Sequence, residues 1–326
     1  MTNPFAPSSS KPGHGTIKLA LLPPSTPILQ TLSYQYPLKL ISPPPLRASN
    51  SSNPILIHAV YLLTYGGGIV AGDTLDLTIH LARRTRLTLL TQGSTKIFKS
   101  TSRDIISRQR TTVDLESSAA LCYLPDPVQP FARSAFEQTQ VYNLRGGDGS
   151  LCVCDWVCEG RSARGEKWGC WRYTSKNEVW GVNEEGKRRL LLRDNLLLEE
   201  GGLPDDGFVG RMDGMGVFGT LILRGPHFKT LAEHFVSEFA LLPRIGGRKW
   251  DAEEEKLSVE EERRVMRQEQ ETKDGLLWTS ASLRGFVLVK FGAREVEGAK
   301  RWLREMLIRE GTVEREFGER ALLCLK

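Results

Sequence analysis

The sequence lacks long apolar stretches. Its longest, such as residues 55–63, are far shorter than the about 20 residues that a membrane-spanning helix needs. The first ten residues have neither a basic start nor a continuous apolar run, and so do not resemble a secretory signal. We therefore expect a cytoplasmic protein with no membrane contact, in which the six cysteines are reduced thiols.

A strong excess of one charge is also missing. Lys and Arg number 44 and Asp and Glu 39, and the two signs are interleaved along the chain. Without a basic cluster or a recognisable motif, nucleic acid is not an expected partner. The five histidines are scattered, and His227 and His234 lie too far apart on a helix to bind one ion as an i, i+4 pair would.

From residue 55 to residue 223, apolar and polar residues alternate, so that the hydrophobic pattern has a period of two residues. Leu75, Leu77, Ile79 and Leu81 alternate with polar residues, and several later segments repeat the pattern. This predicts a mostly β protein, and the absence of a fixed-length repeat argues against a regular solenoid. Apolar residues at helical spacing occur in residues 228–239 and 296–306, which predicts two C-terminal α-helices.

Composition divides the chain unevenly. Residues 1–15 are rich in Pro, Ser and Gly and are expected to form a disordered tail. Residues 16–326 are expected to form a single domain, with a surface loop at 42–54 and a further strand at 283–291. A charged insertion at about 246–275 fits either a solvated helix or a mobile segment, and we favour the mobile segment.

Glycines are concentrated at Gly66, Gly67, Gly68 and Gly72. With Ala71 they fit a dinucleotide-binding pattern, but that pattern requires a helix after it, and here the next segment alternates as a strand. We therefore expect a tight turn in which glycines take positive φ angles, closed by Asp73.

One strand carries an unexpected acid. In residues 151–158 three cysteines and Trp156 share one face, and Asp155 lies on the other, otherwise apolar, face. The spacing does not suit zinc or a disulfide, so buried structural cysteines are the better interpretation. A buried carboxylate is costly unless paired, and Arg161, Arg164 and Glu166 follow closely enough to form a network with Asp155.

Two further segments place a charged residue in stiff surroundings. Lys96 follows a Gly-containing turn and is either a solvated charge or paired with an acid. Asp126 stands between two prolines, which favours either a rigid turn or a carboxylate fixed towards a pocket or partner.

Taken in order, these segments resemble the signature of the UreD/UreH family of urease accessory proteins. The matching stretches are residues 66–73 (GGGIVAGD), 91–98 (TQGSTKIF), 124–127 with 130–131 (LPDP and PF), and 155–156 with 160–168 (DW and GRSARGEKW). Ala71 replaces the usual glycine of the first stretch, and the charged insertion and cysteine-rich strand also depart from the family's pattern.

The resemblance implies a β-helix-like, many-stranded body with two C-terminal helices, and a scaffold rather than an enzyme. It implies assembly with the accessory protein UreF, the GTPase UreG and apo-urease, no tightly bound cofactor, and a polar passage for nickel in transit. Candidates for the passage or its support are Asp73, Asp126, Asp155 and Glu166, with transient nickel contacts at Asp155 and Glu166. Lys96, Arg161 and Arg164 are expected to pair with these acids.

Two alternatives stay open at this stage. One is a β-helix carbohydrate-active enzyme that uses Asp155 and Glu166 as acid and base, with Trp156, Trp168 and Trp171 lining a cleft. The other is an assembly scaffold that makes no metal contact of its own.

Overall fold

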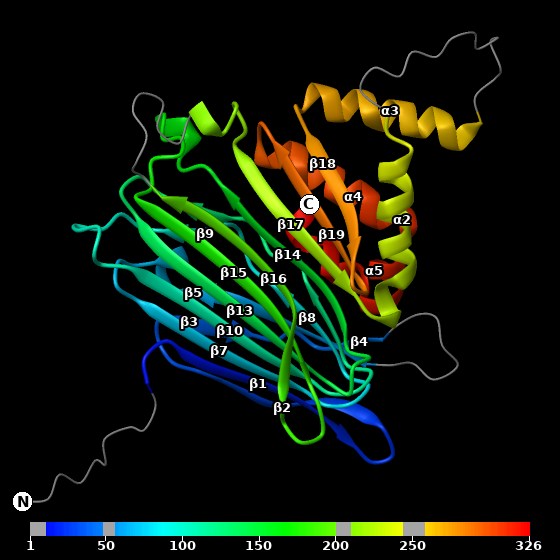
Figure 1. The fold of residues 1–326 in the computed structure, drawn as a ribbon. Helices are drawn as coiled ribbons and strands as arrows, with labels where there is room; N and C mark the ends of the chain where they lie inside the picture. Colours follow the sequence, from blue (N-terminus) through cyan, green and yellow to red (C-terminus); the bar gives the residue numbers. More distant parts are fainter. Residues whose placement is uncertain (1–10, 48–55, 200–209, 244–257) are drawn as a thin grey trace, which may run out of the picture.

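The computed structural model describes residues 11–47, 56–199, 210–243 and 258–326. Two β-sheets face each other, and a layer of helices covers the outer face of the larger sheet (Figure 1). The mostly β prediction with C-terminal helices is confirmed.

The smaller sheet has seven strands, mostly parallel. β1 pairs with β2 and β15 pairs with β16 in antiparallel fashion at its two edges, and the inner pairs are parallel. In spatial order its strands are β16 (Arg188–Glu199), β15 (Arg172–Val182), β13 (Ala135–Arg145), β10 (Ser107–Leu115), β7 (Thr74–Leu81), β1 (His14–Leu22) and β2 (Thr26–Tyr34).

The larger sheet has a parallel centre and antiparallel flanks. Its main path is β18 (Leu277–Leu283), β19 (Phe286–Ala293), β17 (Val217–Arg224), β14 (Ser150–Cys158), β11 (Ala120–Tyr123), β8 (Arg86–Leu90), β5 (Leu56–Thr64) and β3 (Leu38–Ile41). Off this path lie the short strands β4 (Leu46–Arg47), β6 (Gly68–Ile69), β9 (Thr95–Ile97) and β12 (Val128–Pro130).

The chain passes from one sheet to the other and back. β7, β10, β13 and β15 lie in the smaller sheet, and β8, β11 and β14 alternate with them in the larger one. Parallel neighbours need a crossover, and here each crossover is a strand of the opposite sheet. This coiling makes the body β-helix-like, as the family resemblance implied, although the two sheets are not closed into one tube.

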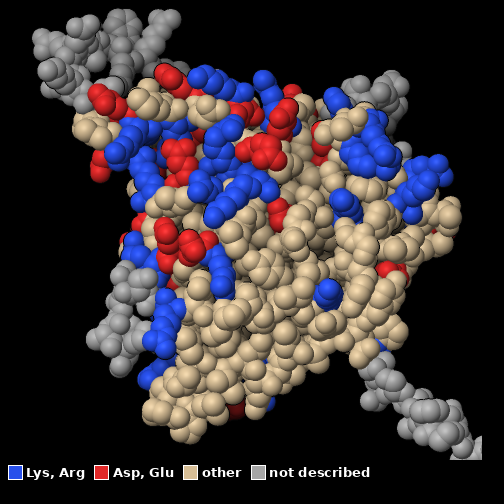
Figure 2. Space-filling view, turned by 180° about the vertical axis from the view of Figure 1, so that it is seen from behind, with Lys and Arg blue, Asp and Glu red and all other residues tan. Residues whose placement is uncertain are grey.

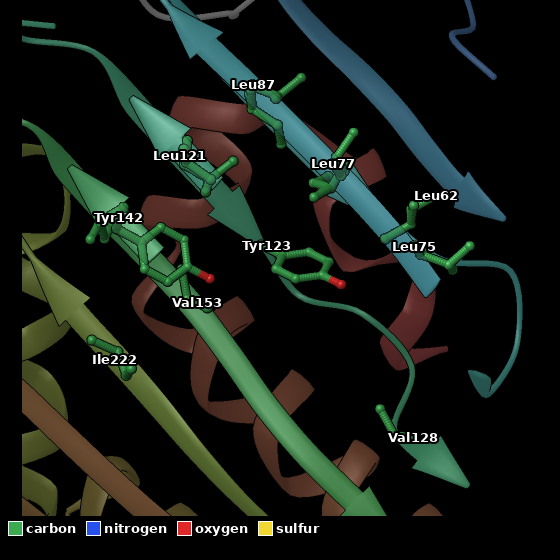
Figure 3. Close-up of a cluster of buried hydrophobic side chains, with 14 of the residues drawn as sticks. Leu62, Leu75, Leu77, Leu87, Leu121, Tyr123, Val128, Tyr142, Val153 and Ile222 are labelled. Carbon is green, nitrogen blue, oxygen red and sulfur yellow. The ribbon is translucent and has the colours of Figure 1, made fainter. Parts of the chain in front are cut away.

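The first core fills the space between the sheets. The alternating residues Leu75, Leu77, Ile79 and Leu81 all point into it, because a strand places every second side chain on one face. Figure 3 shows part of this core, where side chains of both sheets meet.

The second core lies between the larger sheet and the helical layer. The layer contains η3 (Pro226–Phe228), α2 (Lys229–Ala240), α3 (Val259–Lys273), α4 (Val296–Glu310), α5 (Thr312–Phe317) and η4 (Glu319–Leu325). Trp156 and the cysteines of β14 pack here, while Val153 and Val157 pack into the first core. The prediction that this strand is buried on both sides is confirmed, and all six cysteines are buried free thiols.

The charged insertion differs from the mobile segment that we favoured. Its residues 259–273 form α3, which a capping box at Ser258 begins. Arg267 fixes this helix to the protein, because its buried side chain pairs with Glu238 of α2 and with Glu271. Residues 244–257 lie outside the described residues.

Two boundaries also differ. The strand expected at 283–291 is β19, but it begins at Phe286, because Arg284 and Gly285 take positive φ angles and form the two-residue turn that joins it to β18. β1 begins at His14, inside the expected tail, and residues 1–10 lie outside the described part. None of the helices in the described ranges is long and apolar enough to cross a membrane.

Candidate functional site

Polar side chains interrupt the first core in two neighbouring rows of the smaller sheet. In one row Gln109, Gln138 and Ser175 lie side by side on β10, β13 and β15. In the next row the aligned residues are Thr111, Gln140, Asn177 and Asp194. We call these seven residues, together with Asp155, the polar band. Its six neutral members are almost fully buried, at positions where strand alternation would normally place apolar residues.

Asp155 joins the band from the opposite sheet. Its carboxylate accepts hydrogen bonds from Gln138 Nε2 at 2.9 Å, Ser175 Oγ at 2.5 Å and Asn177 Nδ2 at 2.6 Å. These contacts cross from β14 to β13 and β15, so a single carboxylate ties the two sheets together through their interior.

A lysine lies at the open edge of the band. Thr220 and Lys290 are aligned with Asp155 across β17 and β19. Lys290 Nζ lies 2.6 Å from Asp194 Oδ1 and 3.4 Å from Thr220 Oγ1, and half of the lysine side chain is exposed. The band therefore runs from deep inside the protein to the edge where β16 approaches β19.

The electrostatics of Asp155 reflect this position. Burial raises the pKa of its carboxyl, and the hydrogen bonds from Ser175 and Asn177 only partly oppose the effect. The nearby carboxylate of Asp194 raises the pKa further. Asp155 is surrounded by protein, yet part of its surface remains accessible.

Two oxygen atoms of the band lack a protein partner. Thr111 Oγ1 and Asn177 Oδ1 make no hydrogen bond to any residue that the structure describes. Buried polar atoms of this kind are usually satisfied by water. Tyr123 and Tyr142 lie in the same core (Figure 3). The Tyr142 hydroxyl donates a hydrogen bond to Gln140 Oε1 of the band. Oxygen atoms without a protein partner therefore lie among the band residues, where ordered water would satisfy them.

The band does not resemble a resident metal site. No three His, Cys, Asp or Glu side chains gather around a possible ion within residues 11–47, 56–199, 210–243 and 258–326. It offers one deep carboxylate, amide carbonyls and hydroxyls instead, which are ligands that bind a borderline divalent ion weakly.

The network expected between Asp155 and Glu166 is absent among the described contacts. Glu166 pairs with Arg161 and accepts a hydrogen bond from the Ala132 backbone, and the hydrogen bond from Arg161 lowers its pKa. The two carboxylates sit in separate hydrogen-bond networks, because β14 ends at Cys158 and the chain turns through η2 (Ser162–Arg164). Arg164 is exposed and has no ion pair with a described residue.

Asp126 is a fixed carboxylate, one of the two interpretations left open. It accepts hydrogen bonds from Thr91 Oγ1 at 3.1 Å and Gly93 N at 2.9 Å, and pairs with Lys300 of α4 at 2.8 Å. It thereby connects two of the motif segments with the helical layer. Lys96 is exposed and pairs with no described acid, so of its two interpretations the solvated charge is confirmed and the pairing with an acid is wrong.

The glycine turn is confirmed. Gly66, Gly67 and Gly72 take positive φ angles, and Asp73 donates its backbone N–H to Val70 O. Gly68 is extended, but a side chain there would meet Lys96 O at 2.6 Å. The turn comprises η1 (Tyr65–Gly67) and β6, and the strand β7 follows, so no helix N-terminus is available for a pyrophosphate.

Of the band residues, only Asp155 was predicted from the sequence. The available signal was weak: residues 107–112 and 137–140 are polar at nearly every position, which is typical of an exposed strand. Only the pairing register shows that half of these side chains face inward.

Comparison with known proteins agrees with these motifs. The profile of the family described as UreD urease accessory protein matches residues 13–321. Urease accessory protein 4 of Cryptococcus neoformans var. grubii is 30% identical over 313 residues, covering 87% of this chain and 86% of its own length. An uncharacterized urease accessory protein ureD-like of Schizosaccharomyces pombe is 30% identical over 271 residues, which cover 82% of this chain and 84% of that protein.

A bacterial relative matches over a shorter range. Urease accessory protein UreD of Sorangium cellulosum is 34% identical over 206 residues, 63% of this chain and 60% of its own length. The family profile extends over nearly the whole chain, including the polar band, the glycine turn and the helical layer. This chain belongs to the UreD family of urease accessory proteins.

Proposed function

We propose that this protein is a cytoplasmic, non-enzymatic scaffold for nickel insertion into apo-urease. In this proposal it assembles with UreF and UreG, and nickel delivered by UreG crosses the protein along the polar band. Nickel is the cargo, and the protein holds no cofactor of its own.

The position of Asp155 carries the proposal. Burying polar groups in a β core costs free energy, and a protein that needed only stability would have apolar side chains at these positions. Eight polar residues in register, with partnerless oxygen atoms among them, are instead suited to a hydrophilic route through the interior. The exposed edge at Lys290 supplies one opening of such a route.

The chemistry of the band suits an ion in transit. Nickel(II) accepts oxygen ligands, and single carboxylate, carbonyl and hydroxyl contacts release it far more readily than a closed set of thiolates would. The buried thiols of β14 face the other core, away from the band, so they do not compete for the ion.

An enzymatic role for Asp155 and Glu166 is not supported by their surroundings. General acid–base catalysis requires two groups that reach the same substrate. Asp155 is held inside the band, whereas Glu166 is held by Arg161 in the loop after β14. The alternative of an assembly scaffold without metal contacts remains a distinct hypothesis. It differs from our proposal because it predicts normal urease activation after Asp155 is replaced.

The test is co-expression with the matching UreF and UreG, followed by size-exclusion chromatography and activation of apo-urease with nickel. We expect Asp155→Asn to leave complex formation intact and to remove most of the activation. Asp114→Asn, on the outer face of the same body, is the matched control and should activate normally.

Two outcomes would contradict this expectation. Complex formation with normal activation by Asp155→Asn would establish the inert scaffold and refute the passage. A wild-type chain that binds none of the three partners and leaves urease inactive would refute the accessory function itself.

A further inference from the structure

A basic groove lies on the helical layer, far from the polar band in the sequence. It has a volume of about 870 Å³ and is bounded by α3, α4 and the C-terminal residues. Its Lys and Arg side chains are Arg263, Lys300, Arg301, Arg304, Arg309 and Lys326. Only Glu297 and Glu305 oppose them within the lining, although the whole chain is nearly balanced at 44 basic to 39 acidic residues. Figure 2 shows Lys and Arg concentrated, with Asp and Glu among them, on the upper part of one face, whereas the lower part of that face carries few charges.

Two of these six basic side chains are paired with acids. Lys300 pairs with Asp126, and Arg301 pairs with Asp274. Arg263, Arg304 and Arg309 make no ion pair or side-chain hydrogen bond with any residue that the structure describes. An uncommitted guanidinium presents a planar fork of donors that matches a carboxylate.

The same groove has apolar contact surface. Met266 of α3 is 66% exposed and Ile308 of α4 is 40% exposed, and both line it. A flexible thioether adapts to differently shaped apolar side chains, which is why methionine is frequent in binding grooves. The groove therefore combines unpaired positive charge with an apolar floor.

We propose that this groove is a docking surface for an acidic segment of a partner protein, in which carboxylates flank one or two apolar side chains. Arg301, Arg304 and Ile308 follow one face of α4 over about two turns, or roughly 10 Å. A partner helix that presents carboxylates at i and i+3 or i+4 beside a leucine fits this spacing.

Nucleic acid fits the groove less well. Among the residues that the structure describes, no aromatic side chain lines it to stack on a base, and Glu297 and Glu305 would repel a phosphate backbone. The apolar floor would also stay uncovered against a phosphodiester chain. Charge complementarity together with Met266 and Ile308 therefore favours a protein segment.

Lys300 connects this surface to the family motifs. It lines both the basic groove and a neighbouring hollow of about 460 Å³ that contains Thr91, Gln92 and Asp126. A partner bound in the groove would thus contact Lys300, which pairs with Asp126 of one of the motif segments. The inference rests on the groove itself and does not depend on nickel passage.

The first experiment uses the full chain and a fluorescein-labelled amphipathic peptide of repeated Leu-Glu-Glu-Leu, followed by fluorescence anisotropy. We expect salt-sensitive binding that the double variant Arg304→Glu/Arg309→Glu weakens about tenfold or more. The matched control Lys18→Glu/Arg110→Glu makes the same charge change at exposed positions of the smaller sheet, and it should bind like the wild type. Equal binding by both double variants, or tighter binding of a labelled oligothymidine than of the peptide, would overturn the proposal.

The second experiment repeats the comparison with cognate UreF, UreG and apo-urease on a size-exclusion column. Loss of one of these partners from the groove variant alone would identify the protein that carries the acidic segment. If the groove variant binds the peptide weakly and the wild-type chain binds none of the three proteins, the groove proposal stands and the proposed function is refuted. If the groove variant assembles normally and binds the peptide normally, the groove proposal is refuted and the proposed function stands. Self-association lost only in the groove variant would mean that a second copy occupies the groove, against our proposal.

Discussion

Replacing Asp155 by alanine distinguishes a hydrated band from a dry structural network. In the folded protein the carboxylate accepts three hydrogen bonds. Without it Gln138 Nε2 keeps Ser175 Oγ as an acceptor at 3.1 Å, but the Ser175 hydroxyl and Asn177 Nδ2 lose their acceptor. The cost of the substitution depends on whether water takes the vacated position.

The two cases differ in magnitude. A buried donor without a partner costs about 1–3 kcal/mol, so two of them in a dry core would cost roughly 2–6 kcal/mol. Removing the carboxylate also removes the desolvation cost of burying it, the same burial that raises its pKa, and this change stabilises the variant. In a hydrated band water satisfies both donors, and we expect the free energy of unfolding at neutral pH to fall by less than about 2 kcal/mol.

The measurement is denaturant unfolding of Asp155→Ala beside Leu151→Ala. Leu151 lies on the same face of β14 and is fully buried in the first core. Truncation of a buried leucine leaves a cavity and costs about 2–5 kcal/mol. Asp155→Ala should therefore be the less destabilised variant and yet the one that fails to activate urease. If Asp155→Ala is destabilised as much as Leu151→Ala, the band is a dry structural network, and our reasoning for the passage fails.

Three further predictions follow from the structure. Arg267→Met leaves the buried Glu271 without its cation and leaves Glu238 with Arg264 alone, so it should weaken the attachment of α3 by about 3–5 kcal/mol. The measurement is amide hydrogen exchange in that helix, which should become faster; unchanged exchange would contradict the prediction. Gly68→Ala places a methyl group against Lys96 O and should cost about 1–3 kcal/mol, whereas Gly181→Ala meets only ordinary contacts and should be milder; equal unfolding midpoints would count against the turn argument. Folding raises the pKa of Asp155, so its contribution to the free energy of unfolding is present below the unfolded-state pKa and is lost as pH rises through the folded-state pKa. Over that pH range the free energy of unfolding should therefore fall less for Asp155→Asn than for the wild type. Identical pH profiles of the two proteins would refute this prediction.

Local sequence patterns were sufficient for the elements themselves. The alternation of Leu75, Leu77, Ile79 and Leu81 predicts a strand with one buried face, and β7 has that burial pattern. The glycine turn was equally predictable, because positive φ angles favour glycine and no helix pattern follows. These properties depend on residues close together in the chain, so the chain segment itself contains the information.

The charged segment before β18 shows the limit of composition. Its mean polarity suggested a mobile segment, yet residues 259–273 form a docked helix. The deciding contacts are those of Arg267 with Glu238 and Glu271, and Glu238 lies on a different helix. Composition alone does not reveal that Arg267 is paired with Glu238, a residue distant in the chain, rather than solvated.

The candidate site depended on tertiary structure most of all. The sequence identified Asp155 and Asp126 as carboxylates in unusual surroundings, and both are fixed in the structure. It assigned them the wrong partners, because it searched for cations nearby in the chain. Lys300 reaches Asp126 from 174 residues away, and Asp155 is held by neutral side chains of the opposite sheet.

By itself the sequence determined the β-rich class, the turn, the exceptional acids and, through the order of its motifs, the family. Only the tertiary structure decided which polar residues face inward, because strand register is set by pairing across the coil and a shift of one residue would turn every side chain to the other face. The polar band and the basic groove are both products of that assembly. In each of them residues from separate parts of the chain acquire a common environment, and that environment determines their chemistry.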